Sequence, residues 1–385
     1  MKEEIIAAML CGLPLAVAVA NEPTIHTFPS QGITSLKMDV EVGAISVDGT
    51  AGDKITVEDL PDNAAACDIT MAVKGDKLVI TERKKSNSHN DWTYKTGFKV
   101  NISSTMLVSI TAESANMVVS AINGGVDIKA EHGNISLSGV KSTVKLENDS
   151  GVINVKELVG DLTVKSDHSN IDISDLKSTV KLENSSGVIN VKKLEGDLTV
   201  ISDHSNIDIS GAKSNIKLEN GSGVIHVADL TGNLTVKADH NNIDISDLKS
   251  TVKLENDSGV INVKELAGDL TVKSDHCSIT AEALKSNQIS IDAESGSVRL
   301  KGLHNAVYIK SGSGAVNLQW DAAPASGKVE IESGNGDVEL HFPKTAKLSS
   351  QLSASGKIVN EFEADAAGIP VIVKTETGRI SVVKN

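Results

Sequence analysis

The stretch KSTVKLENDSGVINVKELVGDLTVKSDHSNIDISDL, residues 141–176, decides the fold because the chain repeats it with a fixed period of 36 residues. Residues 141–168 and 249–276 differ at a single position, where Val159 corresponds to Ala267. A fixed period of this size is typical of like units that stack in one direction. Such a chain presents one surface repeatedly, whereas an enzyme needs one place where unlike groups converge. Successive copies open at Lys141, Lys177, Lys213, Lys249 and Lys285.

Each copy consists of two similar halves. Ile153 matches Ile171 across 18 residues, and Leu158 matches Leu176 in the same way. Other positions align only with a shift of two residues, which predicts that the turn at Val159-Gly160-Asp161 is longer than its counterpart. Within each half, apolar residues alternate with Lys, Glu or Asn, which is the period-two pattern of a strand with one face turned inward.

These halves predict an all-β fold, a single-stranded parallel β-solenoid (β-helix) with coils of about 18 residues and two coils in each 36-residue repeat. Strands of successive coils then pair in parallel about 4.8 Å apart, with Val, Ile and Leu stacked inside. From residue 105 to the end there is room for about fifteen coils, which gives a rod roughly 70 Å long. A β-propeller is the alternative architecture, and the equivalence of the two half-repeats argues against it.

The N-terminal run predicts export. Its apolar residues end in Ala18-Val19-Ala20, a small-x-small cleavage pattern. The alternative is a disordered apolar end, because Glu3 and Glu4 stand where a signal peptide usually carries positive charge. An exported chain would act in the periplasm, in the cell envelope or outside the cell. The chain then divides into a signal peptide at 1–20, a divergent N-terminal β region or cap at 21–104, five 36-residue repeats at 105–284, and degenerate C-terminal coils with a cap at 285–385.

Composition restricts the partners. The net charge is −14 and only Arg83, Arg299 and Arg379 are arginine, so a nucleic-acid or anionic membrane surface is not expected as a partner. After the leader, no segment is long and apolar enough to cross a bilayer. Aromatic residues are 2% of the chain, so the core must be aliphatic. Cys67 and Cys277 are expected to be free thiols that behave as small apolar residues.

Ser-Gly turns followed by β-branched residues carry a family resemblance. Examples are Ser186-Gly187-Val188-Ile189, the run Ser333–Leu340, and the opening segment Gly43–Gly49. With these motifs the chain resembles the bacterial putative-adhesin family, a group of exported or envelope-associated β-solenoid domains of largely unknown function. The resemblance covers nearly the whole chain after the leader. It implies an architecture and supplies no catalytic residues.

One outward column is rich in Asn and Asp. This alternation relieves like-charge repulsion between neighbouring coils, which is a structural interpretation, while a repeated polar binding face is the functional one. Calcium binding is not expected, because the nonapeptide of calcium-binding β-rolls is absent. Glu147, Lys165 and Glu183 are expected to place opposite charges on adjacent coils. The column consists of Asn154, Asp172, Asn190, Asp208, Asp244 and Asn262, with His226 interrupting it.

Histidines recur at the 36-residue spacing beside carboxylates. Two coils separate neighbours, so they lie about 9.5 Å apart, too far for shared ligation of one zinc ion. A pH-responsive turn is a milder functional hypothesis, since His beside a carboxylate changes charge near neutral pH. The structural alternative is a solvated turn residue copied with its repeat. The column consists of His132, His168, His204, His240 and His276.

These patterns predict a non-enzymatic exported repeat protein, an adhesin-like surface or periplasmic rod that binds through many weak equivalent contacts. We expect no cofactor and no metal. The ligand is not specified by the sequence, and a cell-surface glycan or an envelope protein fits the predicted location. The alternatives are a carbohydrate-active β-helix enzyme and a periplasmic envelope scaffold or sensor module. Evenly dispersed acids argue against the enzyme, because glycoside hydrolysis needs carboxylates that flank one bond.

Overall fold

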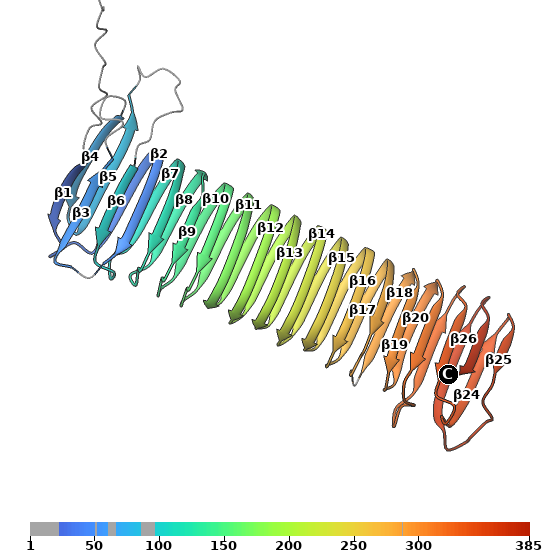
Figure 1. The fold of residues 1–385 in the computed structure, drawn as a ribbon. Coiled ribbons are helices and arrows are strands. Elements are labelled where there is room, and N and C mark those ends of the chain that lie inside the picture. Colours follow the sequence, from blue (N-terminus) through green and yellow to red (C-terminus); the bar gives the residue numbers. More distant parts are fainter. Residues whose placement is uncertain (1–22, 51, 61–66, 86–96, 287) are drawn as a thin grey trace, which may run out of the picture.

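The computed structural model describes residues 23–50, 52–60, 67–85, 97–286 and 288–385, and the predicted signal peptide lies outside them. The described chain is an all-β rod of stacked parallel coils, so the predicted β-solenoid is confirmed (Figure 1). Within these residues the structure has no helix that could cross a membrane.

The central coils, which we call the repeat body, contain eight strands. They pair in parallel in chain order, with Val144 opposite Leu162 and Leu162 opposite Val180. The register is therefore 18 residues at every position, and the expected shift of two residues is wrong. The Val159-Gly160-Asp161 turn matches its counterpart in length. The strands are β10 (Val144–Lys156), β11 (Leu162–Lys177), β12 (Val180–Glu195), β13 (Leu198–Lys213), β14 (Ile216–Thr231), β15 (Leu234–Lys249), β16 (Val252–Leu266) and β17 (Leu270–Glu282).

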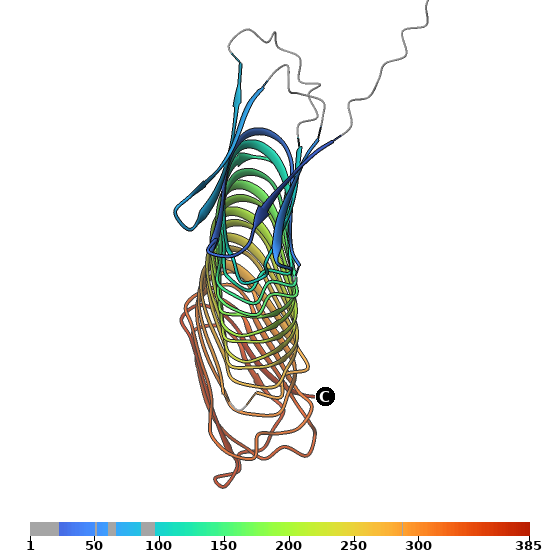
Figure 2. The same ribbon diagram turned by 90° about the vertical axis from the view of Figure 1, so that its left-hand side faces the viewer.

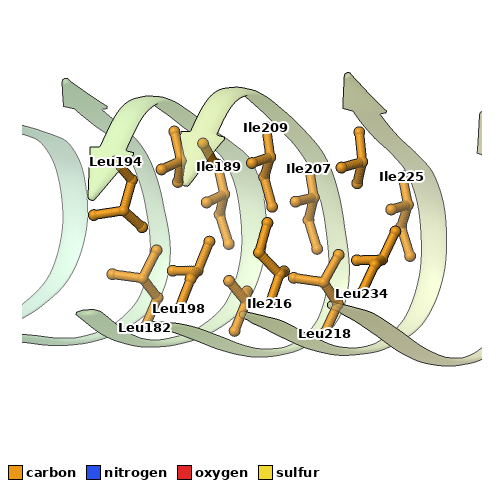
Figure 3. Packing of buried hydrophobic residues seen from close by; sticks show 14 of the residues in the cluster. Leu182, Ile189, Leu194, Leu198, Ile207, Ile209, Ile216, Leu218, Ile225 and Leu234 are labelled. Atoms are coloured by element: carbon orange, nitrogen blue, oxygen red, sulfur yellow. The ribbon is translucent and has the colours of Figure 1, made fainter. Parts of the chain in front are cut away.

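Each coil is flattened, with two long arms joined by two corners (Figure 2). In the first coil of the body the first arm is Val144–Asn148 and the second arm is Val152–Lys156. Inward residues of both arms form aliphatic ladders, such as Ile189, Ile207 and Ile225, each no more than 2% exposed (Figure 3). Burying each such side chain contributes about 1.5–3 kcal/mol. Repetition of these ladders along the rod replaces the single globular core of a compact domain.

The two corners use positive backbone φ for different reasons. Gly259 belongs to the corner between the arms, where an added Cβ would lie 2.1 Å from the carbonyl oxygen of Asn241 on the preceding coil. Glycine is required there by close approach. The corner that links successive coils instead holds non-glycine residues such as Glu157, Asp175 and Lys193, with φ of 55°, 59° and 53°. Side chains are accommodated at this second corner because they point outward.

At the N-terminal end the first coil in the sequence is not the outermost in space. Strand β2 (Ser35–Gly49) pairs in parallel with β7 (Leu107–Ser120) on one side, and with β5 (Lys77–Lys84) and β6 (Gly97–Ile102) on the other. Antiparallel strands cover β5 and β6, and two short strands join β7 to the repeat body. These are β1 (Thr24–Pro29), β3 (Lys54–Asp59), β4 (Cys67–Lys74), β8 (Val126–His132) and β9 (Ile135–Ser138).

The C-terminal coils, β18–β27, contain the same kind of inversion. The last coil in sequence, β26 and β27, lies between β22 and β23 on one side and β24 and β25 on the other. The final strand is therefore internal, and its expected role as the end cap is wrong. The strands are β18 (Ile289–Ser295), β19 (Val298–Leu303), β20 (Val307–Ser313), β21 (Val316–Trp320), β22 (Val329–Ser333), β23 (Val338–Phe342), β24 (Leu348–Ala354), β25 (Ile358–Asn360), β26 (Ile369–Thr375) and β27 (Ile380–Lys384).

Candidate functional site

The outward residues of the second arms form a repeated surface, which we call the polar face. The predicted Asn/Asp residues all lie on it in one column, because Asn154 pairs with Asp172, Asp172 with Asn190, and Asn190 with Asp208. His226 continues the column to Asp244 and Asn262. All are half-buried. The structure therefore brings these six residues together as a line of side chains.

Within this column neighbouring coils are bonded through their side chains. Asn190 Nδ2 donates to Asp172 Oδ1 at 2.7 Å, and Asn262 Nδ2 donates to Asp244 Oδ1 at 2.7 Å. Each such bond uses one Asn hydrogen and one Asp oxygen. The second Asp oxygen and the Asn oxygen can still accept bonds from a ligand, because a carboxylate and an amide each carry several acceptor positions. The column can therefore serve stability and recognition together.

A second column on the polar face, which sequence reasoning missed, alternates Val with Asn. Asn170 Oδ1 accepts the backbone N–H of Val188 at 3.0 Å, and Asn206 Oδ1 accepts that of Val224 at 3.0 Å. These valines remain 37% and 41% exposed. The signal in the sequence was an apolar residue after each Gly of the repeated Ser-Gly turn, at an outward position. The face thus offers methyl groups and amides at regular intervals of about 4.8 Å.

The first arms carry Lys and Glu in a surface that we call the charged face. Lys145 Nζ and Lys129 Nζ lie 2.6 and 3.0 Å from Glu147, and Lys165 Nζ lies 3.2 Å from Glu183. The predicted Lys165–Glu183 pair is present, whereas Glu147 contacts the lysines of its own and the preceding coil. Hydrogen bonds from Lys145 and then Lys129 lower the pKa of Glu147. The charges of this face therefore largely neutralise each other.

The five histidines lie on the corner between the arms, in a column that alternates with serine. Ser150 lies between His132 and His168, and Ser258 lies between His240 and His276. His132 Nδ1 is 2.8 Å from Ser150 Oγ. The structure does not bring the histidines together, and the described residues include no group of three His, Cys, Asp or Glu that could hold a metal ion. A pH response of this column stays a prediction.

The interior of the same corner holds an asparagine ladder that the sequence analysis did not identify. Asn220 Nδ2 lies within hydrogen-bond distance of Ser205 O, Ser222 O and Asn241 Oδ1, at 3.0, 2.9 and 2.7 Å. Its side chain is 3% exposed. The amide therefore satisfies buried backbone carbonyls at the bend. The sequence signal was an asparagine three residues before every corner glycine of the body, at Asn148, Asn184, Asn220 and Asn256.

Cys277 belongs to this ladder. Asn256 Nδ2 lies 3.1 Å from its Sγ, and the Sγ lies 3.3 Å from Asn256 O. The prediction of a small apolar role is therefore wrong for Cys277, which occupies a position held by Ser or Asn in earlier coils. Cys67 is also free and buried, as expected. Burial, followed by a hydrogen bond with Glu82, raises the pKa of Cys67 to about 12.

One half-open hollow of about 570 Å³ lies along the corner that links successive coils. Asp229, Asp247 and Glu265 line it from three successive coils, together with Lys249 and Lys285. Like the other surfaces, it repeats groups of one kind along the axis. Its three carboxyl groups lie side by side, one coil apart.

The match to a family model spans residues 33–228 and 228–367, and the family is described as Toastrack DUF4097. The chain belongs to the Toastrack DUF4097 family. This confirms the family resemblance drawn from the Ser-Gly turns. No curated protein matches this Toastrack chain.

Three solved structures are similar to this Toastrack protein at low identity. A putative cell adhesion protein from Clostridium sporogenes is 12% identical, with 78% of this chain and 100% of that chain covered and a TM-score of 0.18. A putative adhesin from Parabacteroides merdae is 11% identical, with 83% and 96% covered and a TM-score of 0.22. A putative adhesin from Bacteroides fragilis is 13% identical, with 94% and 97% covered and a TM-score of 0.21. At these TM-scores the likenesses carry no argument about function.

Proposed function

We propose that this Toastrack protein is an exported, non-enzymatic, adhesin-like rod that binds a cell-surface glycan through the polar face. The observation that carries the proposal is the in-register column of Asn and Asp beside exposed valines, repeated along the rod. Amide and carboxylate groups can exchange hydrogen bonds with sugar hydroxyls, and the exposed methyl groups can contact the apolar faces of a sugar. The export and envelope location belong to the proposal, since the leader lies outside the described residues.

Binding of this kind depends on multiplicity. Each coil pair supplies a weak contact, and a polymeric ligand that follows the rod engages several pairs at once. The charged face is a poorer candidate because its lysines and glutamates are already engaged with each other. An enzyme would instead concentrate its activity on one segment of the rod. The absence of variation along the repeat body therefore supports binding over catalysis.

A glycan array with the full chain tests the proposal. A double substitution of Asn190→Ala and Asn262→Ala removes two amides from the polar face, and we expect at least a tenfold loss of apparent affinity through reduced multivalency. The matched control, Lys181→Ala with Lys253→Ala, alters the charged face at equivalent coils and should change affinity by less than about twofold. Equal losses in both variants would contradict the choice of face.

Deleting residues 177–212 separates binding from catalysis. A multivalent binder should lose affinity gradually with one repeat fewer, whereas an enzyme with its site on that repeat should lose activity completely. Recovery of a stable partner protein from periplasmic extract, without any glycan binding by the wild type, would instead favour the envelope scaffold role.

A further inference from the structure

The two ends of the rod differ in how their outermost strand edges are protected. At the N-terminal end the outer strands are antiparallel, and β1 ends in Pro29 while β4 carries Asp68 and Lys74. Proline and charge on an edge strand prevent unwanted strand pairing. At the C-terminal end the outermost strand is β24, with sequence LSSQLSA. It contains no charged residue and no proline.

Within the described residues, β24 pairs only with β26 and so has one free edge. The free edge is closed at its first residue, because Asp365 N–H donates to Leu348 O at 3.1 Å. No described strand covers the part from Ser350 to Ala354. Backbone N–H and C=O groups alternate in direction along a strand, so those of Ser350, Leu352 and Ala354 point the same way as those of Leu348. They form a short template for strand addition.

The side chains at this edge also lack a neighbouring coil. Leu352 and Ala354 continue the inward columns of the core, yet both are half-buried, whereas Val373 on the next coil is 1% exposed. The hydroxyl of Ser350 is buried and has no hydrogen-bond partner among the described residues. A covering strand would therefore bury apolar surface and exclude water from these groups.

We propose that this edge pairs with the same edge of a second copy, so that two rods join tail to tail. A two-fold axis through Leu352 places Ser350 opposite Ala354, Gln351 opposite Ser353, and Leu352 opposite itself. No like charges meet in this antiparallel register, and the two half-buried leucines cover each other. The register leaves Leu348 free for its bond with Asp365. The resulting dimer carries two polar faces on one rod of doubled length.

Sedimentation velocity of the full chain over a concentration series tests the dimer. We expect the weight-average mass to rise from that of one chain toward two and to stop there. A mass of one chain at every concentration overturns the proposal. Growth beyond two chains also overturns it, because head-to-tail addition would produce open-ended polymers.

Charge substitutions test the register. Gln351→Lys with Ser353→Lys places like charges opposite each other twice, and we expect at least a tenfold weaker dimer. Gln351→Lys with Ser353→Glu places opposite charges together twice and should strengthen the dimer severalfold. The control is Ser290→Lys on β18, which lies in the same column as Gln351 but on an inner coil. Identical behaviour of the two double variants would overturn the pairing.

Discussion

The repeat body and the C-terminal coils solve the same stacking problem differently. In the body every coil takes 18 residues and covers the coil before it, so one coil pair is interchangeable with another. In the C-terminal coils the last coil is inserted between two earlier ones, and Trp320 and Phe342 stack with ring centroids 4.2 Å apart. The difference shows that repetition permits changes of length, whereas the end of a stack needs specific contacts.

The largest effect is expected from removing one coil at the C-terminal end. Truncation after Gly368 removes β26 and β27, which are the only described partners of β24 and β25. The coil from β24 to β25 should then detach and expose β22 and β23. Hydrogen exchange should show loss of protection from β22 to β25. Deletion of residues 177–212 from the body removes more residues, yet it should leave the Tm within about 3 °C.

A deletion of half that length should break the interchangeability of the body. Removing residues 180–197 stacks two coils of the same type and places Asp172 opposite Asp208. It also removes Asn184 from the buried ladder. We expect the free energy of unfolding to fall by roughly 3–5 kcal/mol, since like charges meet and buried carbonyls lose their donors. Denaturant unfolding would measure this, and a result equal to that of the 36-residue deletion would make the single coil the interchangeable unit.

The same corner column should show a smaller difference between the two regions. Asn220→Ala leaves the carbonyls of Ser205 and Ser222 without their side-chain donor and should lower the free energy of unfolding by about 2–4 kcal/mol. In the C-terminal coils this column holds Ser333, whose Oγ accepts from Gly336 N–H at 3.2 Å. Ser333→Ala should lower stability by about 1 kcal/mol. Comparable losses by chemical denaturation would show that the amide has no special role.

The smallest effect concerns pH. Hydrogen bonds from lysines lower the pKa of Glu147, Glu183 and Glu219 in the body, with Lys145, Lys181 and Lys217 as the main donors. Depressed pKa values stabilise the fold above the usual carboxyl value of about 4.3, and this contribution disappears as pH falls through the folded values. Thermal unfolding from pH 6 to pH 3 should show a slight decline that Glu183→Gln reduces. An unchanged decline would assign the acid sensitivity to other carboxyl groups.

Asp337 gives the matching test in the C-terminal coils. Hydrogen bonds from Arg379 lower its pKa, so Asp337→Asn should reduce acid sensitivity in the same pH range. The sign would be the same in both regions, because each pair joins neighbouring coils. A larger effect in the variant of the C-terminal pair would indicate that the end of the stack, rather than the body, limits acid stability.

The sequence predicted the outward Asn/Asp column correctly because a strand alternates its faces with period two. It could not show that Asn148 and its equivalents turn inward, since an asparagine beside Asp149, Ser150 and Gly151 also fits an exposed turn. Likewise it could not show that Cys277 joins a polar ladder. These side chains are placed by the carbonyl groups of neighbouring coils, which no local pattern contains.

The sequence by itself determined the parallel coil, its 18-residue length and the residues that face the core, because identical local patterns must all be satisfied by one geometry. Only the tertiary structure decided which coil lies outermost at each end and which strand edge remains free. That outcome depends on contacts between segments far apart in the chain, where strands from several positions compete for the same edge.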